Sequence, residues 1–334
     1  MKAIAYKNPS IKLDSYSLED INLPKPVPNG RDILVKIEAV SVNPVDTKIR
    51  SREKPTIGEY RILGWDAAGV VDSIGNEVSF FSPGDKVWYA GAINRQGTDA
   101  EYHLVDERIV SHMPTSLDFS EAAALPLTSI TAWELLFDRF QLSKKSKGKL
   151  LIIGAGGGVG SILIQLAKKL TNLTVIASAS RVETKEWVTS LGADFTIDHH
   201  TSIVSGMNQI GINNVNYIAG LTKTKNHFSE ISEIITPQGH LGVIDDLSDC
   251  DLMQLKRKSI SIHWEFMFTR SLFTTDDMIQ QHEILSKVAK MVDEGDIKST
   301  MTLHMGKINS TNLINAHRIS ESGKGKGKIV LSGF

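Results

Sequence analysis

The pattern of hydrophobic positions between residues 150 and 178 predicts a strand, a helix and a second strand. Leu150-Leu151-Ile152-Ile153 is a continuous apolar run that is too short for a helix and is followed by glycine. Apolar residues then recur at steps of three and one from Val159 to Leu170, which is the spacing of one helix face. A second apolar run covers residues 173–177. This order predicts a βαβ unit.

The glycine-rich turn of this unit predicts a dinucleotide site. Its pattern places alanine at the first glycine position of Gly-x-Gly-x-x-Gly, and its residues are Ala155, Gly156, Gly157, Gly158, Val159 and Gly160. Such glycines let the backbone approach a pyrophosphate, which then binds the N–H groups at the helix N-terminus. A glycine-rich loop without a ligand is the alternative. The flanking strand and helix favour the dinucleotide site, because the motif has meaning only in that context.

The end of the second strand predicts which dinucleotide binds. An NAD-preferring site usually places Asp or Glu about 20 residues after the glycines, on the ribose 2′-hydroxyl. Here the chain has Ser178, Ser180 and Arg181, with no acid before Glu183. Hydroxyls and a guanidinium bind a 2′-phosphate through charge-assisted hydrogen bonds. We therefore predict NADPH, with an exposed helix-start residue as the alternative role of Arg181.

The two halves of the chain differ in their pattern of apolar runs and turn residues. Residues 1 to about 120 contain short apolar runs between Pro, Gly and Asn turns, which predicts a small β-barrel-like domain. A helix begins at Ser120 with a hydroxyl cap, and another is expected over Thr128–Phe137. Strands then alternate with helices, which predicts a doubly wound parallel α/β sheet. Its six expected strands are Leu150–Ile153, Thr174–Ser178, Phe195–Ile197, Val215–Ala219, Leu241–Ile244 and Ile260–His263.

The last sixty residues are too few for a domain and are expected to pack back onto the N-terminal part. Their predicted elements are a helix over Asp276–Glu294, a strand over Met301–His304, a helix over Asn309–Glu321 and a strand over Lys328–Leu331. Gly323–Lys328 alternates glycine and lysine and is expected to form a surface loop. We predict a catalytic domain of residues 1–124 completed by 270–334, and a nucleotide domain of residues 125–269.

Composition narrows the class of protein. The 334 residues favour two domains, and the 41% of hydrophobic residues is typical of a globular enzyme. A net charge of −1 argues against nucleic acid as a partner. The single cysteine, Cys250, excludes an intrachain disulfide. No apolar run approaches the roughly 20 residues of a membrane span, and the N-terminus lacks the apolar core of a signal peptide. We therefore expect a cytoplasmic protein without a membrane partner.

An ordered set of short motifs carries a resemblance over essentially the whole chain. The motifs are Ser41–Asp46, Gly64–Gly69, Gly84–Val87, Leu125–Thr128, Ala155–Gly160 and Leu191–Asp194. The chain resembles the medium-chain dehydrogenases/reductases, in the zinc-free quinone oxidoreductase branch, whose members are often labelled zinc-type alcohol dehydrogenase-like. The resemblance implies a GroES-like β-rich catalytic domain, a Rossmann domain and an active site in the cleft between them. It also implies a homodimer.

The same resemblance predicts that no metal binds. Catalytic zinc needs three protein ligands, usually Cys, His or acids. Zinc-dependent relatives carry a cysteine in the loop that here is Asn43-Pro44-Val45-Asp46, and Gly-His-Glu where this chain has Gly64-Trp65-Asp66. Tryptophan cannot ligate zinc. Residues 91–103 contain no cysteine that could form the four-cysteine structural lobe of those relatives.

The resemblance also supplies candidate residues on the substrate side. It places Asn43 and Thr128 near the nicotinamide and the substrate. Asn43 is a candidate donor to the substrate carbonyl, and a plain turn residue before Pro44 is the equally weighted alternative. Asp46 and Tyr60 are candidate proton or hydrogen-bond donors, although a structural role is the stronger interpretation for each.

Topology supplies further cofactor contacts, because ligands bind beyond the carboxyl ends of parallel strands. Gly242, Val243 and Ile244 end one such strand. Trp264 and Phe266 follow another, and they form either a wall of the nicotinamide pocket or the core of a domain interface. Lys185 and His199 are expected near the adenosine 2′-phosphate.

Together these features predict a zinc-independent oxidoreductase. We expect it to transfer a hydride from NADPH to a small electrophile, a quinone or an α,β-unsaturated carbonyl. A zinc-dependent alcohol dehydrogenase is the alternative enzyme. A protein that binds NADPH without turnover, as a sensor or structural protein, is the alternative of another class.

Overall fold

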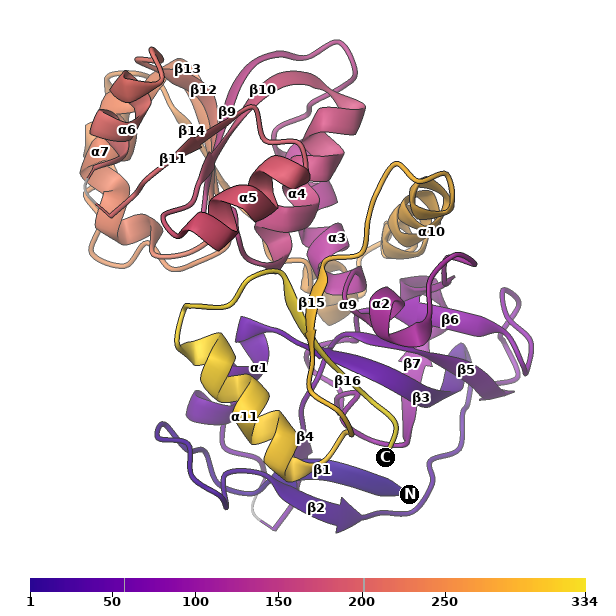
Figure 1. The fold of residues 1–334 in the computed structure, drawn as a ribbon. Coiled ribbons are helices and arrows are strands. Elements are labelled where there is room, and N and C mark those ends of the chain that lie inside the picture. Colours follow the sequence, from indigo (N-terminus) through magenta and orange to yellow (C-terminus); the bar gives the residue numbers. More distant parts are fainter. Residues whose placement is uncertain (57, 201) are drawn as a thin grey trace. The chain divides into compact units, whose positions relative to one another are not determined.

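The computed structural model describes residues 1–56, 58–200 and 202–334. The chain divides into two compact units, and each is described by itself (Figure 1). The first unit combines Met1–Ile130 with Phe268–Phe334, and the second is Thr131–Met267. These bounds lie within a few residues of the predicted domain limits. No helix in the described part of the chain combines the length and apolarity that crossing a membrane requires.

The second unit is a doubly wound parallel sheet, as predicted. Its strand order is β11-β10-β9-β12-β13-β14, with all neighbours parallel. Figure 1 shows α4 and α5 on one side of this sheet and α6 and α7 on the other. The strands are β9 Lys147–Ile153, β10 Asn172–Ser178, β11 Phe195–Ile197, β12 Val215–Gly220, β13 Ile235–Val243 and β14 Ser261–Trp264. The main helices are α4 Gly158–Leu170, α5 Val182–Ser190, α6 Ile203–Gln209, α7 Phe228–Ile234 and α8 Met253–Lys256, with a 3-10 turn over Thr224–His227.

The apolar runs that predicted these strands form the core of the unit. Leu151, Ile176 and Ile218 come from three neighbouring strands and pack with Ile231 of α7 in one buried cluster. The face of α4 that the sequence marked as apolar is buried from Ile162 to Ala167. Burial of this continuous apolar surface is the main favourable term in the stability of the unit.

The first unit is β-rich, which fits the predicted GroES-like domain. A seven-stranded sheet has the order β15-β16-β3-β5-β6-β8, with β7 paired to β3, and a three-stranded sheet has the order β2-β1-β4. The strands are β1 Lys2–Tyr6, β2 Glu19–Asn22, β3 Asp32–Val42, β4 Arg61–Ile62, β5 Ala67–Ile74, β6 Lys86–Tyr89, β7 Tyr102–Asp106, β8 Val110–His112, β15 Met301–His304 and β16 Lys328–Ser332. The helices are α1 Pro44–Arg52, α2 Phe119–Ala123, α9 Thr269–Phe273, α10 Gln280–Asp293 and α11 Ser310–Glu321, with a 3-10 turn over Glu107–Ile109.

The C-terminal tail packs onto the N-terminal part, as predicted. Its strand β16 lies between β15 and β3 and pairs with β3 in antiparallel register, with Ile329 opposite Val42. The tail therefore completes a sheet whose other strands come from the first 112 residues. This register fixes where the side chain at the start of β16 points.

Three predicted helix limits need correction. The cap near residue 120 is Asp118, not Ser120, because Asp118 and Glu121 form a capping box with each other's backbone N–H groups. The helix expected over Thr128–Phe137 is α3, Pro126–Trp133, which continues as a π-helix over Glu134–Arg139. The helix expected from Asp276 begins at Gln280. Side-chain bonds from Thr275 and Arg270 to Asp277 hold the preceding segment as a turn.

The glycine at residue 160 yields a test of the nucleotide-binding turn. A Cβ at Gly160 would lie 2.4 Å from the backbone oxygen of Ala155, so the helix and the turn pack without space for a side chain. We expect Gly160→Ala to lower the free energy of unfolding by roughly 1–3 kcal/mol, the range for overpacking, despite the higher helix propensity of alanine. Urea unfolding measures this loss.

The matched control is Gly325→Ala, since a Cβ at Gly325 would meet open space. We expect the control to unfold like the unchanged protein. Equal stability of both variants would show that the turn tolerates a wider separation from α4.

Candidate functional site

The motif Ser41–Asp46, which the resemblance places near the substrate, forms the end of a strand and the N-terminal cap of a helix. Strand β3 ends at Val42, and Asn43 is the N-cap of α1, with Pro44 at the first helical position that proline favours. The Asn43 N–H donates to Asp46 Oδ2 at 2.7 Å. Asn43 and Asp46 are 2% and 1% exposed, so both side chains lie inside the unit.

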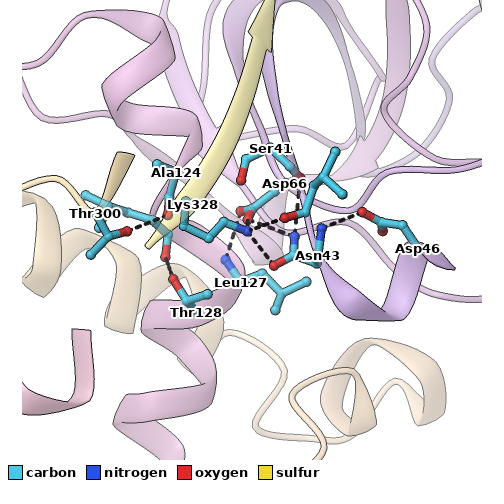
Figure 2. A network of polar contacts seen from close by, with 11 residues as sticks. Ser41, Asn43, Asp46, Asp66, Ala124, Leu127, Thr128, Thr300 and Lys328 are labelled. Atoms are coloured by element: carbon cyan, nitrogen blue, oxygen red, sulfur yellow. Dashed lines mark hydrogen bonds and ion pairs between the residues drawn. The ribbon is translucent and has the colours of Figure 1, made fainter. Parts of the chain in front are cut away.

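A buried ammonium joins this cap to the rest of the sheet (Figure 2). Lys328 opens β16, and its Nζ donates to Val42 O at 3.0 Å, to Asn43 Oδ1 at 2.5 Å and to Asp66 Oδ2 at 3.1 Å. An ammonium has three donors, and here each has an acceptor. Lys328 is only 3% exposed, and a buried charge of this kind needs such pairing to be tolerated.

Asp66 receives donors from three separate parts of the unit. Besides Lys328, the Nδ2 group of Asn43 donates to Oδ2 at 3.0 Å, and the Leu127 N–H donates to Oδ1 at 3.0 Å. Leu127 lies in the first turn of α3, where a negative charge is favourable. Burial raises the pKa of Asp66, while the charge of Lys328 and the donated hydrogen bonds lower it. Asp66 thus ties the start of β5, the end of β3, β16 and the start of α3 together.

Asp46 is a buried carboxyl group beside this network. Burial raises its pKa to about 7, while the hydrogen bond from the Asn43 N–H and the charge of Lys328 lower it and the charge of Asp66 raises it. Its second oxygen, Oδ1, has no hydrogen-bond partner among the described residues. Burial and the charge of Asp46 also raise the pKa of Asp99 well above its usual range. The buried Lys328 ammonium therefore lies in the field of two buried carboxyl groups, Asp66 and Asp46.

The structure places the four predicted substrate-side residues in different settings. Asn43 has both amide hydrogens engaged, by Asp66 Oδ2 and by Ser41 O at 3.3 Å, which favours its structural alternative over a donor to substrate. Thr128 is buried and its hydroxyl donates to Leu125 O at 3.0 Å. Tyr60 packs with a small apolar cluster near the N-terminus and lies beneath the Lys7 ammonium. Asn43 and Asp46 thus belong to the network, Thr128 follows Leu127, whose N–H donates to Asp66, and Tyr60 belongs to another part of the unit.

The glycine turn in the second unit has the geometry of an anion-binding helix start. Gly157 is the N-cap of α4, and Gly154 has φ +86°, a conformation that suits glycine. Residues 156–159 are partly exposed, whereas Ala155 and Gly160 are buried. The first N–H groups of a helix have no intrahelical acceptor, so they are available to a pyrophosphate.

The predicted adenosine-end residues belong to the segments that follow β10 and β11. Strand β10 runs parallel to β11, with Ser178 opposite Ile197, so both strands end on the same side of the sheet. Arg181 is the N-cap of α5, its side chain is 38% exposed, and it forms an ion pair of 3.2 Å with Glu183. A hydrogen bond from the His200 N–H lowers the pKa of Asp198, with a smaller contribution from the charge of Lys185, and burial with the charges of His200 and His227 lowers the pKa of His199.

The two serines of this edge differ. Ser180 is partly exposed. The Ser178 hydroxyl is buried and accepts a hydrogen bond of 3.0 Å from the Gly154 N–H, so it orders the glycine turn. The geometry therefore gives Ser178 a supporting role that its place in the sequence did not indicate.

At the other end of the sheet, the backbone of β13 defines the predicted contacts. Gly242 and Val243 are buried, the Ile244 N–H donates to Gly220 O at 3.2 Å, and Val243 O accepts from the Glu265 N–H at 2.9 Å. Trp264 and Phe266 are 56% and 46% exposed in this structure, so neither is a core residue of its unit.

Three charged residues were missed by the sequence analysis. Lys328 belongs to both the predicted glycine–lysine loop and the predicted terminal strand, and neither assigns it a partner, while Asp66 is the one charged residue of the motif Gly64–Gly69. Glu265 is 3% exposed and accepts a hydrogen bond of 2.8 Å from Arg139 Nε. Burial and the neighbouring Glu134 raise the pKa of Glu265 to about 9. In each case an acid or a lysine inside an apolar run was the available signal.

The residues at the zinc-ligand positions do not fit zinc. Trp65 is fully buried, and its indole N–H donates to Ala92 O at 3.1 Å. The side-chain oxygen of Asn43 faces the Lys328 ammonium, and a metal ion there would meet a positive charge. Across residues 1–56, 58–200 and 202–334, no three His, Cys, Asp or Glu side chains are grouped so that they could hold a metal ion.

The pKa of Asp46 predicts an unusual pH dependence of stability. The folded state keeps the Asp46 proton up to about pH 7, whereas the ordinary value for an aspartate is 3.8. The folded state thus binds the proton more tightly, and the free energy of unfolding should fall as the pH rises from 4 to 7, by about 4 kcal/mol at most. Asp46→Asn should reduce this slope by the share of Asp46, leaving the contributions of Asp66 and Asp99. Urea unfolding between pH 4 and 8 measures it, and identical slopes for both proteins would show that Asp46 is ionised when folded.

Comparison with known proteins places the chain. Residues 29–115 match the model of the alcohol dehydrogenase GroES-like domain, and residues 191–331 match that of the zinc-binding dehydrogenases. A zinc-type alcohol dehydrogenase-like protein of Staphylococcus aureus strain MSSA476 is 42% identical, over 99% of this chain and 100% of that protein. A crystal structure from Rhizobium etli CFN 42, provisionally named a zinc-dependent alcohol dehydrogenase, is 49% identical, with a TM-score of 0.95 over 100% of this chain and 98% of that one.

A plant enzyme is similar over a shorter stretch. The 2-methylene-furan-3-one reductase of Solanum lycopersicum is 37% identical over 215 residues, which are 60% of this chain and 52% of the plant protein. The same family is indicated by the two family models, by the near-complete match to the bacterial relative, and by the two units, one built on a parallel sheet and the other β-rich. The chain therefore belongs to the medium-chain dehydrogenase/reductase superfamily of oxidoreductases.

Proposed function

We propose that this oxidoreductase transfers a hydride from NADPH to a quinone or an α,β-unsaturated carbonyl without zinc. The observation that carries the proposal is the contact between the Lys328 ammonium and Asn43 Oδ1, at a position where zinc-using relatives carry a metal ligand. Trp65 lies at a second such position, and its indole N–H donates a hydrogen bond to Ala92 O. This chain therefore lacks the ligand set that would polarise an alcohol oxygen through a metal.

The second unit supports the cofactor half of the proposal. The turn at residues 154–160 and the start of α4 would hold the pyrophosphate on backbone N–H groups. Arg181 caps α5, Lys185 lies in α5 and His199 follows β11, and a 2′-phosphate would bind among them through charge-assisted hydrogen bonds. The exposed ion pair between Arg181 and Glu183 contributes little to stability, so Arg181 can exchange it for a phosphate at small cost.

The acceptor half rests on what chemistry remains without a metal. NADPH supplies the hydride when it is bound. A quinone or an enone is already electron-poor, and its reduction requires positioning and hydrogen bonds to the oxygen where charge develops. The name of the Solanum lycopersicum relative describes reduction of a 2-methylene-3-ketone, which is an acceptor of this class. In this chain the buried network would fix the wall against which such an acceptor is held.

Arg181 tests the preference for NADPH. We expect Arg181→Ala to weaken NADPH binding by roughly 1.5–3 kcal/mol, the range for hydrogen bonds to charged groups, because the 2′-phosphate loses its guanidinium. NADH binding should change little, since NADH has no 2′-phosphate. Fluorescence titration with each cofactor measures both affinities.

Arg257→Ala removes an exposed arginine elsewhere in the same unit and serves as the control. It should leave both cofactor affinities unchanged. Equal losses for NADPH and NADH in Arg181→Ala would show that Arg181 supports the fold or the adenine instead of the 2′-phosphate.

Metal removal tests the reaction itself. We expect chelator treatment to leave the rate of NADPH oxidation by a small quinone unchanged, and ethanol to be a poor hydride donor to NADP⁺. Steady-state absorbance at the nicotinamide band measures both, with protein purified without chelator. Activity that disappears on chelation and returns with zinc would support the zinc-dependent alternative. Tight NADPH binding without turnover of any quinone or enal would support the binding-protein alternative.

A further inference from the structure

We propose that Lys328 is a positioning residue whose ammonium acts as an internal cation, ordering the substrate-side loop at the place where zinc-using relatives hold a metal ligand. The proposal rests on the metal-free function above. The effect of Lys328 on stability can be measured without substrate, so this proposal and the proposed function can be contradicted separately.

The backbone fixes the ammonium in place. Gly327 has φ +53°, and a Cβ there would lie 2.4 Å from Thr300 O, so the chain turns tightly as it enters β16. The Lys328 N–H then donates to the same Thr300 O at 2.8 Å, and Ile329 pairs with Val42 of β3. This register directs the side chain of Lys328 across the sheet to the end of β3 (Figure 2).

The ammonium joins segments that are far apart in the chain. Its three acceptors are the carbonyl of Val42, the amide oxygen of Asn43 and the carboxylate of Asp66. The Asp66 carboxylate also contacts α3, because its other oxygen, Oδ1, accepts a hydrogen bond from the Leu127 N–H at the start of that helix. Lys328 therefore sets the position of Asn43 directly and that of the α3 start, which carries Thr128, through Asp66.

A cation is needed here, and a neutral donor would not replace it. Asp66 is fully buried, and a buried carboxylate without its counter-charge is costly. The charge of Lys328 also lowers the pKa of the neighbouring Asp46. A divalent ion bound to Asn43 Oδ1 would lie within a few ångströms of the ammonium and be repelled, so the chain's own cation and a metal exclude one another.

The contribution of Lys328 is tested by removing the ammonium and then supplying another. Lys328→Ala should lower the melting temperature by roughly 6–20 °C, because it leaves the buried carboxylate unpaired. Propylammonium at tens of millimolar should recover a large part of this loss by filling the space and restoring the charge. Propanol at the same concentration has a similar shape without charge and should not. Lys324→Ala, an exposed lysine of the same segment, is the control and should melt like the unchanged protein.

Two results would overturn the proposal: an unchanged melting temperature in Lys328→Ala, or equal recovery with propanol and propylammonium. If Lys328→Ala does not fold, the double variant Lys328→Met/Asp66→Asn removes both charges together. It should fold and keep its NADPH affinity while the turnover number for a quinone falls at least about tenfold, because the loop and α3 lose their link. An unchanged turnover number in a folded double variant would also overturn the proposal. If the unchanged protein did not oxidise NADPH with any quinone or enone, that result would instead contradict the proposed function.

Discussion

The buried ion pair between Lys328 and Asp66 is the constraint on which the substrate side of this enzyme depends. It joins the last strand of the chain to the strands and helix start that carry the substrate-side motif, across 262 residues of sequence. A pair of this kind contributes less to net stability than to specificity of arrangement, because the desolvation cost of both charges offsets much of their attraction. The pair matters because loss of either partner would leave the other as an uncompensated charge buried in the sheet.

Under the proposed function, this pair would explain how a fold that holds zinc in some relatives can work without the metal. In the zinc-using relatives the resemblance places a ligand at the position of Asn43, and a metal ion there would polarise the substrate. Here Asn43 holds an ammonium and its amide hydrogens are bound to Ser41 and Asp66. The ammonium can order the loop, but its donors are fully used, so it cannot act as a Lewis acid. Under the proposed function, the chemistry would shift to acceptors that need positioning more than polarisation, and the hydride would come from a cofactor bound by the second unit.

The sequence predicted the parts of the structure that depend on local pattern. The six parallel strands follow from apolar runs separated by helical spacing, and the glycine turn follows from the need for close backbone approach. The missed residues depend on distant pairing. Lys324, Lys326 and Lys328 look equivalent in a glycine–lysine run, and only the register of β16 against β3 puts the third of them inside. The sequence leaves Asn43 open between a donor to substrate and a turn residue, because its partners, Asp66 and Lys328, cannot be identified before the strands are paired.

The most direct test of the account is a crystal structure with NADPH, from protein purified without chelator, with anomalous diffraction recorded at the zinc absorption edge. The account predicts no zinc peak beside Asn43, an ammonium of Lys328 in contact with Asn43 and Asp66, and the 2′-phosphate next to Arg181. A zinc peak beside Asn43, with the Lys328 side chain turned away from Asp66, would contradict it.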